Sequence, residues 1–344
     1  MGKTIKFIAK RLLFSVFVLV GLSILIFVIA RVMPGNPARM ALGARAPEWA
    51  VERLREEMHL NEPFYVQYYY WANGALHGNF GMSLITRRSV ANDIKEFFPA
   101  SLELALYAGI FMGIIGIILG TISGWYANTW VDNLVRIISY MGIITPSFVF
   151  AIFFVLIFSY VLEILPTIGR LTPGVVPPPS ITGIITFDAL IAGRFNVFFD
   201  ALKHLLLPAI SLAMGPLSQE ARITRASLVD NVQKDYIASE RSCGIPERTI
   251  MFKYLLKPSL IPTITIYGLD FASILGNAFL VELIFSWPGL SRYGMNAMLQ
   301  KDLNAITAVV LVLGLVFIIA NIVVDLTVGY LDPRIGLGVE RGDE

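Results

Sequence analysis

Long apolar runs constrain this chain more than any other feature of its sequence. Residues 12–30 carry no charged side chain, and about 19 apolar residues is the length that an α-helix needs to cross a hydrocarbon core of about 30 Å. Comparable stretches recur along the chain. They predict six membrane-spanning helices, over residues 12–30, 101–126, 134–162, 204–220, 258–284 and 305–328.

Composition points the same way. The 344 residues are 56% hydrophobic and 15% charged, whereas soluble domains carry about 25% charged residues. The net charge is +2, and the basic residues gather near predicted membrane ends rather than in one patch, which argues against nucleic-acid binding. One cysteine and three scattered histidines predict neither a disulfide framework nor a metal site. We therefore expect an all-α, multi-pass membrane protein rather than a soluble enzyme.

The first apolar run is interpreted as a membrane helix rather than a signal peptide. A signal peptide has an apolar core of about 7 to 15 residues followed by a small-residue cleavage site, and Arg31 and Pro34 fit such a site poorly. The predicted organisation starts with a cytoplasmic N-terminus over residues 1–11. A first helix over residues 12–33 and a polar insert over residues 34–98 follow.

The insert is too long to be a plain connection, so we expect it to have structure of its own. Ala50, Leu54 and Met58 repeat at helical spacing, which predicts an amphipathic helix. A second helix is expected to begin near Pro63, with four aromatic residues at Tyr65, Tyr68, Tyr69 and Trp71. These rings suit either an interfacial belt at headgroup level or a docking surface for an external protein.

Glycine and proline set the expected packing of the second and third spans. Small residues at spacings of three and four predict a smooth stripe that another helix approaches closely. In the second span they are Gly109, Gly113, Gly116, Gly120 and Gly124. Pro146 predicts a kink in the third span. Glu103 is expected near the outer end of the second span, where an acid costs little.

Charge decides the predicted topology. The basic N-terminus and the segment rich in arginine and lysine after residue 220 should share the cytoplasmic side, so an even number of crossings separates them. The apolar stretch over residues 181–193 is short for a span and is assigned to an outer loop over residues 163–203. Both termini are then cytoplasmic, with a core over residues 99–330 and a tail over residues 331–344.

A polar, mixed-charge segment separates the fourth and fifth spans. It reads DYIASERSCGIPERTIMFKYLLKPSLIP from residue 235 to residue 262. Gly244 permits a tight turn, and Pro246 followed by Glu247 suits the start of a short helix. Pro258 and Pro262 are expected to open the next span.

This segment resembles the EAA loop of ABC-transporter permease subunits, in the form used by dipeptide and oligopeptide permeases. Matches fall at Ala238, Gly244, Glu247, Arg248, Leu256, Leu260, Ile261 and Pro262, and departures at Glu240, Ser242 and Cys243. The resemblance implies a loop over residues 229–257 that couples the subunit to cytoplasmic ATPases. The implied contact residues are Ala238, Ser239, Glu240, Arg241, Cys243, Gly244, Ile245, Pro246, Glu247 and Arg248.

Similar matches extend from residue 11 to about residue 337. They include RLLFSVFVLVGLSILIFVIARVMPGNPA, LNEPFYVQYYYWANGALHGNFGMSL, VELIFSWPGLSRYG and NIVVDLTVGYLDPRIGL, and only residues 166–203 lack one. The resemblance implies a six-helix permease subunit of an ABC importer in the cell membrane, with a helical external insert between helices 1 and 2. It also implies peptide import together with a second permease, two cytoplasmic ATPases and an external substrate-binding protein.

The chain itself is not expected to bind nucleotide. A phosphate-binding loop reads GxxxxGK[ST], and the only fragment of one is Gly2-Lys3-Thr4. We expect no cofactor and no bond-changing catalysis in this chain, with ATP and Mg²⁺ held by the partner ATPases.

Ionisable residues within the spans are candidates for the translocation path. Asp270 lies about 12 residues into the fifth span, where the family usually has glutamine, and shares a helix face with Asn277. Glu220 lies at the inner end of the fourth span, near Arg222 and Arg225. The structural alternatives are a buried hydrogen bond for Asp270 and a solvated, positive-inside boundary for the arginines.

Other functions compete with peptide import. Members of the same branch import oligosaccharides or nickel. A proton-coupled secondary transporter would use Asp270, Glu282 and Asp325 as a relay, although Glu282 and Asp325 also suit contacts at helix ends. A membrane-embedded enzyme would need a zinc-type HExxH helix or a GxSxG elbow, and the sequence contains neither.

Overall fold

The computed structural model describes residues 2–32, 37–43, 45–57 and 59–331. Over these residues the chain is helical, apart from connections and one isolated β-bridge between Met82 and Ser89. The helices are α1 (Gly2–Val32), α2 (Pro37–Leu42), α3 (Glu48–Glu57), α4 (Phe64–Leu76), α5 (Val90–Trp125), α6 (Trp130–Ile144), α7 (Ser147–Phe154), α8 (Ile185–Ile191), α9 (Phe195–Val232), α10 (Asp235–Ser242), α11 (Glu247–Thr249), α12 (Leu256–Asn277), α13 (Phe279–Ile284), α14 (Leu290–Leu299) and α15 (Leu303–Leu331). Two wider, π-helical stretches, η1 (Val155–Val161) and η2 (Ile250–Leu255), continue α7 and precede α12.

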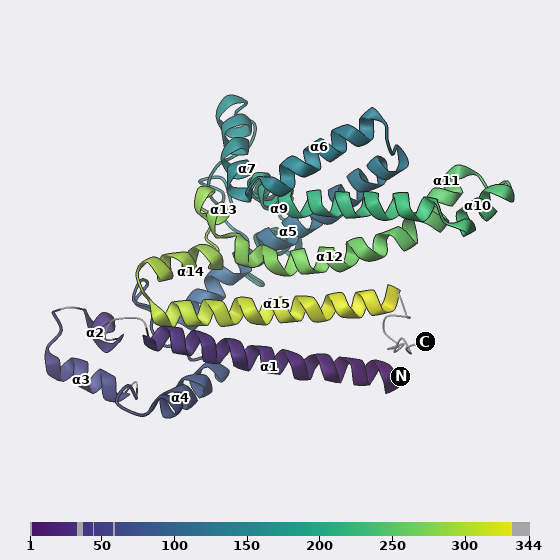
Figure 1. Cartoon of the computed structure of the whole chain (residues 1–344). Coiled ribbons are helices and arrows are strands. Elements are labelled where there is room, and N and C mark those ends of the chain that lie inside the picture. The colour runs from purple at the N-terminus through teal and green to yellow at the C-terminus, as the bar shows by residue number, and fades with distance from the viewer. Residues whose placement is uncertain (1, 33–36, 44, 58, 332–344) are drawn as a thin grey trace.

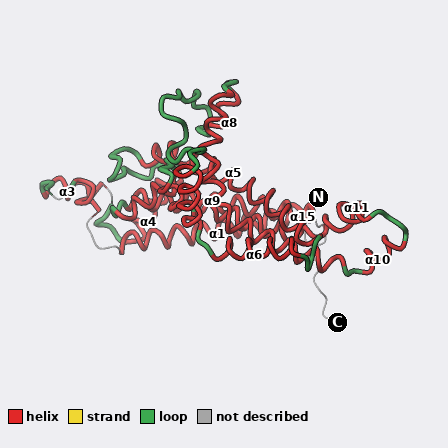
Figure 2. Tube along the Cα trace, turned by 90° about the horizontal axis from the view of Figure 1, so that it is seen from above, coloured by secondary structure: helices red, strands yellow, loops and turns green. Residues whose placement is uncertain are grey.

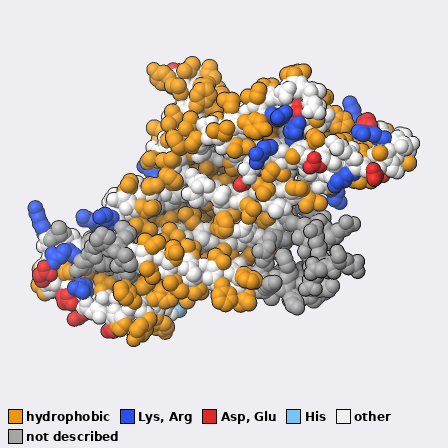
Figure 3. Space-filling view, in the orientation of Figure 1, with side chains coloured by type: hydrophobic (Ala, Val, Ile, Leu, Met, Phe, Trp, Pro, Cys, Tyr) orange, Lys and Arg blue, Asp and Glu red, His pale blue; other side chains and the backbone are white. Residues whose placement is uncertain are grey.

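The long helices run between two ends of the molecule, and different short helices lie at each end. Figures 1 and 2 both place α3 at one end and α10 with α11 at the other, and α1 begins toward the α10 end. Charged side chains gather mainly at these two ends, while hydrophobic side chains cover most of the surface between them (Figure 3). An apolar surface between polar ends is the arrangement expected of a protein that crosses a bilayer.

Four helices are long and apolar enough to cross a membrane. They are α5, α9, the continuous run Glu247–Asn277 and the Leu303–Val324 part of α15. The bent pair of α6 with α7 and η1 gives a fifth candidate if it counts as one span, and the apolar part of α1, Leu13–Ile29, is shorter than the four. The described residues thus carry four or five candidate spans, and the six-span arrangement stays a prediction.

The third predicted span is sharply bent at its proline. Trp130–Ile144 and Ser147–Val161 meet at 109°. Thr145 adopts extended backbone, with φ −86° and ψ 124°, because the ring of a following proline disfavours the helical conformation. The kink predicted at Pro146 is confirmed, and it redirects the chain rather than merely tilting one helix.

Several element bounds differ from those expected. α9 extends well beyond residues 204–220 at both ends, with Pro208 and Pro216 inside it. Pro262 likewise lies inside α12 rather than at its start. Membrane helices tolerate interior prolines because neighbouring groups satisfy the freed carbonyls, so a proline is a weak boundary signal here. The apolar stretch 181–193 contains only the seven-residue α8, which packs on α9.

Close packing of α5 against α9 and α12 forms the centre of the fold. A Cβ on Gly120 would lie 2.5 Å from the carbonyl oxygen of Ala221 on α9. A Cβ on Gly113 would lie 2.8 Å from the ring of Tyr267 on α12. The close packing predicted from the glycine stripe is confirmed, and the stripe serves two neighbouring helices rather than one.

Another part of the same core lies where the turn between α13 and α14 packs on α5. Phe285 and Trp287 are fully buried there. The indole Nε1 of Trp287 donates a hydrogen bond of 2.8 Å to the carbonyl oxygen of Ala100. Pro99 lies inside α5 next to this residue, and the indole therefore ties the loop after α13 to the α5 backbone.

Candidate functional site

The segment between α9 and α12 folds as a short helical hairpin. α10 ends at Ser242, Gly244 takes a φ of +74°, and α11 begins directly after Pro246. A positive φ is readily adopted only by glycine, so the tight turn predicted at Gly244 and the helix start predicted at Pro246 are confirmed. We call residues 235–255 the α10–α11 hairpin.

Buried side chains hold one face of the hairpin against the end of α9. The cluster consists of Leu228, Ile237, Ile250, Met251 and Leu255. Across the turn, the Nε of Arg241 donates to Glu247 at 2.8 Å, and both side chains are exposed. This hydrogen bond raises the pKa of Arg241. The hairpin is therefore anchored on one side and free on the other.

All ten predicted coupling residues lie on this hairpin. Eight of them are exposed, while Glu240 and Ile245 are half-buried, and Ile245 packs against the cluster. The free thiol of Cys243 is exposed beside the turn. The structure thus gathers these residues on one small surface. This surface lies at the same end of the molecule as the start of α1 (Figure 1).

Two of the three predicted path residues lie close together between α9 and α12. The carboxylate of Glu220 faces Gly116 of α5, and Asp270 on α12 lies within its electrostatic range. Glu220 is fully buried, and no described residue donates a hydrogen bond to either of its carboxylate oxygens or to Oδ2 of Asp270. Asn277 is exposed at the last residue of α12, about 10 Å further along the helix axis. Glu220 and Asp270 are therefore two acids with unsatisfied carboxylate oxygens on neighbouring helices, and Asn277 is separate from them.

The aromatic residues of α4 divide into two groups. Tyr68 and Trp71 pack on Phe27 of α1, with ring centroids 5.4 and 5.5 Å apart. Tyr65 and Tyr69 are 75% and 66% exposed. The second pair is the more open to another molecule, since the first is half-buried and anchors α4 to α1.

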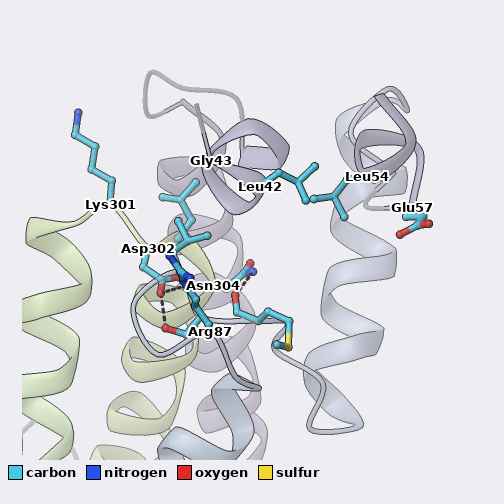
Figure 4. A pocket seen from close by; sticks show the side chains of 13 residues that line it. Leu42, Gly43, Leu54, Glu57, Arg87, Lys301, Asp302 and Asn304 are labelled. Atoms are coloured by element: carbon cyan, nitrogen blue, oxygen red, sulfur yellow. Dashed lines mark hydrogen bonds between the residues drawn. The ribbon is translucent and has the colours of Figure 1, made fainter. Parts of the chain in front are cut away.

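A cavity of about 770 Å³ opens where the insert meets the turn between α14 and α15. Leu42 of α2 and Leu54 of α3 point toward each other on one side of it, and the side chains of Arg87 and Lys301 come from the other (Figure 4). The buried carboxylate of Asp302 accepts hydrogen bonds from Ser83 Oγ at 2.7 Å and Leu84 N at 2.6 Å. That carboxylate fixes the cavity wall rather than facing a ligand.

The structure also shows ion pairs that the sequence analysis missed. Arg225 is bound to the buried Asp132 on α6 through two contacts of 2.6 Å, so it is not the solvated boundary residue that the sequence suggested. Glu103 is likewise buried, and it pairs with Arg170. These partners lie 93 and 67 positions apart. No local spacing signal identifies them, although each acid within an apolar run calls for a partner.

The two remaining candidates for a proton relay are Glu282 and Asp325. Glu282 is fully buried and accepts hydrogen bonds from Ser101 Oγ and from the backbone N–H of Arg292, as expected of a contact between helices. The side chain of Asp325 lies outside the part of the chain that the structure describes. Within the described residues, no group of three or more metal-ligating side chains is assembled.

Comparison with known proteins identifies the family. Residues 116–337 match the model of the binding-protein-dependent transport system inner membrane component, and residues 4–105 match the model of its N-terminal region. The chain is 39% identical over 94% of its length to the probable D,D-dipeptide transport system permease protein DdpB of Escherichia coli, covering 95% of that protein. It is 38% identical over 95% of its length to the dipeptide transport system permease protein DppB of Alkalihalophilus pseudofirmus, covering 98% of it.

A third relative is less similar in sequence but matches a comparable share of the chain. The glutathione transport system permease protein GsiC of Shigella flexneri is 31% identical over 96% of this chain and is covered over 99% of its own length. The match over residues 116–337 includes α9, the α10–α11 hairpin and α12, which carry the coupling and path residues described above. This chain is therefore a multi-pass membrane protein of the family of inner membrane components of binding-protein-dependent transport systems.

Proposed function

We propose that this chain is a permease subunit of an ATP-driven importer of short peptides. The observation that carries the transport mechanism is the α10–α11 hairpin, which is anchored on α9 by buried residues and exposed on its other face. The hairpin joins α9 to α12, so a soluble protein that moves it also moves two helices of the central bundle. Its ten coupling residues are the proposed contacts with the ATPases.

The proposed topology has six crossings, formed by α1, α5, the bent pair α6 and α7, α9, α12 and α15. Support comes from the arrangement of the ends, because α1 begins toward the end that carries the α10–α11 hairpin (Figure 1). Both termini and the hairpin are then cytoplasmic, and α2–α4 form an external insert. Residues 332–344 of the proposed cytoplasmic tail lie outside the described residues.

The proposed cargo is a short peptide. The relatives named as dipeptide and D,D-dipeptide permeases match this chain almost from end to end. The adjoining carboxylates of Glu220 and Asp270 suit the ammonium group that every unblocked peptide carries. We therefore propose that both line the translocation path, with Asn277 further along α12 toward the external end.

The remaining parts of the machine are proposed as partners. They are a second permease, two ATPases that bind ATP and Mg²⁺, and an external substrate-binding protein that docks near Tyr65 and Tyr69. This chain carries no cofactor and changes no bond. Closure of the ATPases would shift the permease between two conformations with opposite access.

A proton-coupled transporter is the second candidate, because the buried acid Glu220 and the half-buried acid Asp270 lie within electrostatic range of each other. The extended relay through Glu282 has less support, since that carboxylate already accepts hydrogen bonds from neighbouring groups. Oligosaccharide or nickel import by the same ATP-driven machinery differs only in cargo.

Uptake by cells that carry the complete transporter, with and without this chain, tests the proposal. We expect uptake of a labelled dipeptide to require the chain, to stop on depletion of ATP and to continue when the proton gradient is collapsed. Uptake that survives ATP depletion but fails without the gradient would support the proton-coupled candidate. Chain-dependent uptake of a maltooligosaccharide or of nickel, without any of the dipeptide, would replace the cargo.

A further inference from the structure

We propose that a small basic cavity between α5, α6 and α9 binds the phosphate of an anionic phospholipid from the cytoplasmic leaflet. The cavity measures about 110 Å³. Its polar lining residues are Ser123, Ser139, Tyr140, Arg136, Arg222 and Arg225, and no acidic residue lines it. We call this the basic cavity. The assignment to the cytoplasmic leaflet rests on the topology proposed above. The proposal that the cavity binds a phosphate does not depend on that topology.

Only one of the three arginines is neutralised by the protein. The buried Asp132 behind the cavity binds Arg225 through two contacts of 2.6 Å. Asp132 also accepts hydrogen bonds from Ser123 Oγ at 2.6 Å and from the backbone N–H of Asn128 at 2.8 Å. These four contacts use both oxygens of the carboxylate. Asp132 therefore holds Arg225 in place and leaves little capacity for another cation.

Arg136 and Arg222 have no such partner. Both are exposed, and no described acid forms an ion pair with either of them. Basic side chains gather over α6 and α9 on the face seen in Figure 3. Two arginines without an acidic partner that line one small cavity favour a planar or tetrahedral oxyanion, since the fork of N–H donors matches carboxylate and phosphate oxygens.

The cavity has room for a phosphate but is too small for a whole cargo molecule. Pockets that enclose drug-sized ligands measure about 300 to 1,000 Å³, so a cavity of about 110 Å³ admits a single headgroup-sized anion. The other side chains of the lining, Val135, Ala221 and Ala226, are small or apolar. They offer no further polar groups with which to read a peptide.

The surroundings favour a lipid as the source of that phosphate. Trp125, Tyr126 and Trp130 are exposed at the turn between α5 and α6, as in the aromatic belts that mark a membrane interface. Arg136 follows Trp130 by six positions, or about 9 Å of helix, and a long arginine side chain that extends toward the headgroups covers most of that distance. A headgroup bound in the basic cavity thus lies close to interface depth.

A wall for the acyl chains is present next to the cavity. Ile137, Ile138 and Met141 follow Arg136 on α6 and are 58%, 40% and 61% exposed. Basic pockets between membrane helices on the cytoplasmic side are a recognised way of binding anionic lipid headgroups. Trp130, Arg136 and these apolar side chains thus follow one another along α6.

Native mass spectrometry of the full-length protein in detergent, titrated with lipid, tests the proposal. We expect the wild-type protein to retain one phosphatidylglycerol at least five-fold more tightly than phosphatidylcholine. Arg136→Gln combined with Arg222→Gln should weaken phosphatidylglycerol binding at least five-fold and leave phosphatidylcholine binding unchanged. The charge-preserving pair Arg136→Lys and Arg222→Lys should keep a clear preference for phosphatidylglycerol.

A matched control removes the same charge elsewhere at this end of the molecule. Lys234 and Lys253 are exposed on or beside the α10–α11 hairpin, so the double glutamine variant at these positions should bind phosphatidylglycerol within two-fold of wild type. Equal binding of the two lipids by the wild-type protein would overturn the proposal. An equal loss in the lysine control would overturn it as well, because the effect would then be one of net charge.

Competition identifies the source of the anion. Inorganic phosphate at millimolar concentration should not displace the lipid; displacement would assign the cavity to a free anion. Displacement by a dipeptide would assign it to the cargo. Because this readout requires neither ATP nor transport, its failure leaves the proposed importer function standing, and a failed uptake assay leaves the lipid site standing.

Discussion

Arg170 donates a hydrogen bond to the carboxylate of Glu103 at 2.5 Å, and their side chains are 14% and 1% exposed. The other carboxylate oxygen of Glu103 accepts from the backbone N–H and the hydroxyl of Thr186, at 2.8 and 2.7 Å. The guanidinium of Arg170 also lies 5.7 Å from the ring of Trp287. One buried acid on α5 therefore fastens two separate parts of the loop that precedes α9.

Breaking this pair should destabilise the loop strongly. Arg170→Gln leaves the buried carboxylate without its cation, which costs about 3 to 5 kcal/mol in comparable pairs. Arg194→Gln is the matched control, because Arg194 is half-buried like Arg170 but donates only to the carbonyl oxygens of Val176 and Pro177 and not to a buried acid. Thermal unfolding in detergent should show a large loss for Arg170→Gln and a small one for the control. Equal losses would mean that the ion pair is not the fastening.

The glycine stripe on α5 makes a second prediction about stability. Gly120→Ala should weaken the packing of α5 on α9, because its Cβ would meet the backbone oxygen of Ala221 at 2.5 Å and backbone cannot move aside cheaply. Gly276→Ala, also within a helix, meets nothing within 4 Å and should be neutral or stabilising by about 0.5 to 1 kcal/mol. Detergent unfolding curves of the two variants compare them. A stable Gly120→Ala protein would show that the two helices are not held at this distance.

The turn of the α10–α11 hairpin makes a prediction about coupling. Gly244 has a φ of +74°, a conformation that costs about 1 to 2 kcal/mol for most residues and less for asparagine. Gly244→Ala should therefore reduce ATP-driven uptake, while Gly244→Asn should restore most of it. Uptake and membrane abundance are measured together. If alanine and asparagine behave alike, the backbone conformation of the turn does not matter for transport.

The exposed thiol of Cys243 reports the orientation of the hairpin. Under the proposed topology, an impermeant thiol reagent should label it in inside-out vesicles and not in sealed right-side-out vesicles. Addition of the ATPases should slow the labelling several-fold. Labelling from the outer face would contradict the six-crossing topology. An unchanged labelling rate in an assembled complex would instead remove the hairpin from the ATPase contact.

Asp270 and Glu282 should respond differently to loss of charge. Asp270→Asn should change uptake or cargo preference with little effect on stability, since no described residue hydrogen-bonds its Oδ2. Glu282→Gln should destabilise the protein, because Glu282 accepts from Ser101 Oγ and from the N–H of Arg292 at 2.7 Å. Uptake assays and unfolding curves on both variants separate the two roles. If the Asp270→Asn variant takes up every tested cargo like the wild-type protein, Asp270 has only a structural role.

Local chemistry explains why much of this fold follows from the sequence. The turn at Gly244, the helix start at Pro246 and the bend at Pro146 depend on one or two residues and their backbone preferences, so they were predictable. The glycine stripe of α5 likewise predicted a closely packed neighbouring helix. The apolar runs located the long helices because a bilayer selects length and hydrophobicity, which are properties of the sequence itself.

The tertiary structure decided what each polar residue does. Nothing near Glu103 or Arg225 in the chain reveals a partner 67 or 93 positions away, because an ion pair depends on how helices cross rather than on spacing along one of them. For the same reason the sequence offered Tyr68 and Tyr69 as equivalent rings, whereas packing against α1 half-buries Tyr68 and leaves Tyr69 66% exposed. The sequence by itself determined the helices, the turns and the family; only the crossing of α5, α6, α9 and α12 determined which charges are neutralised and which stay open to a ligand.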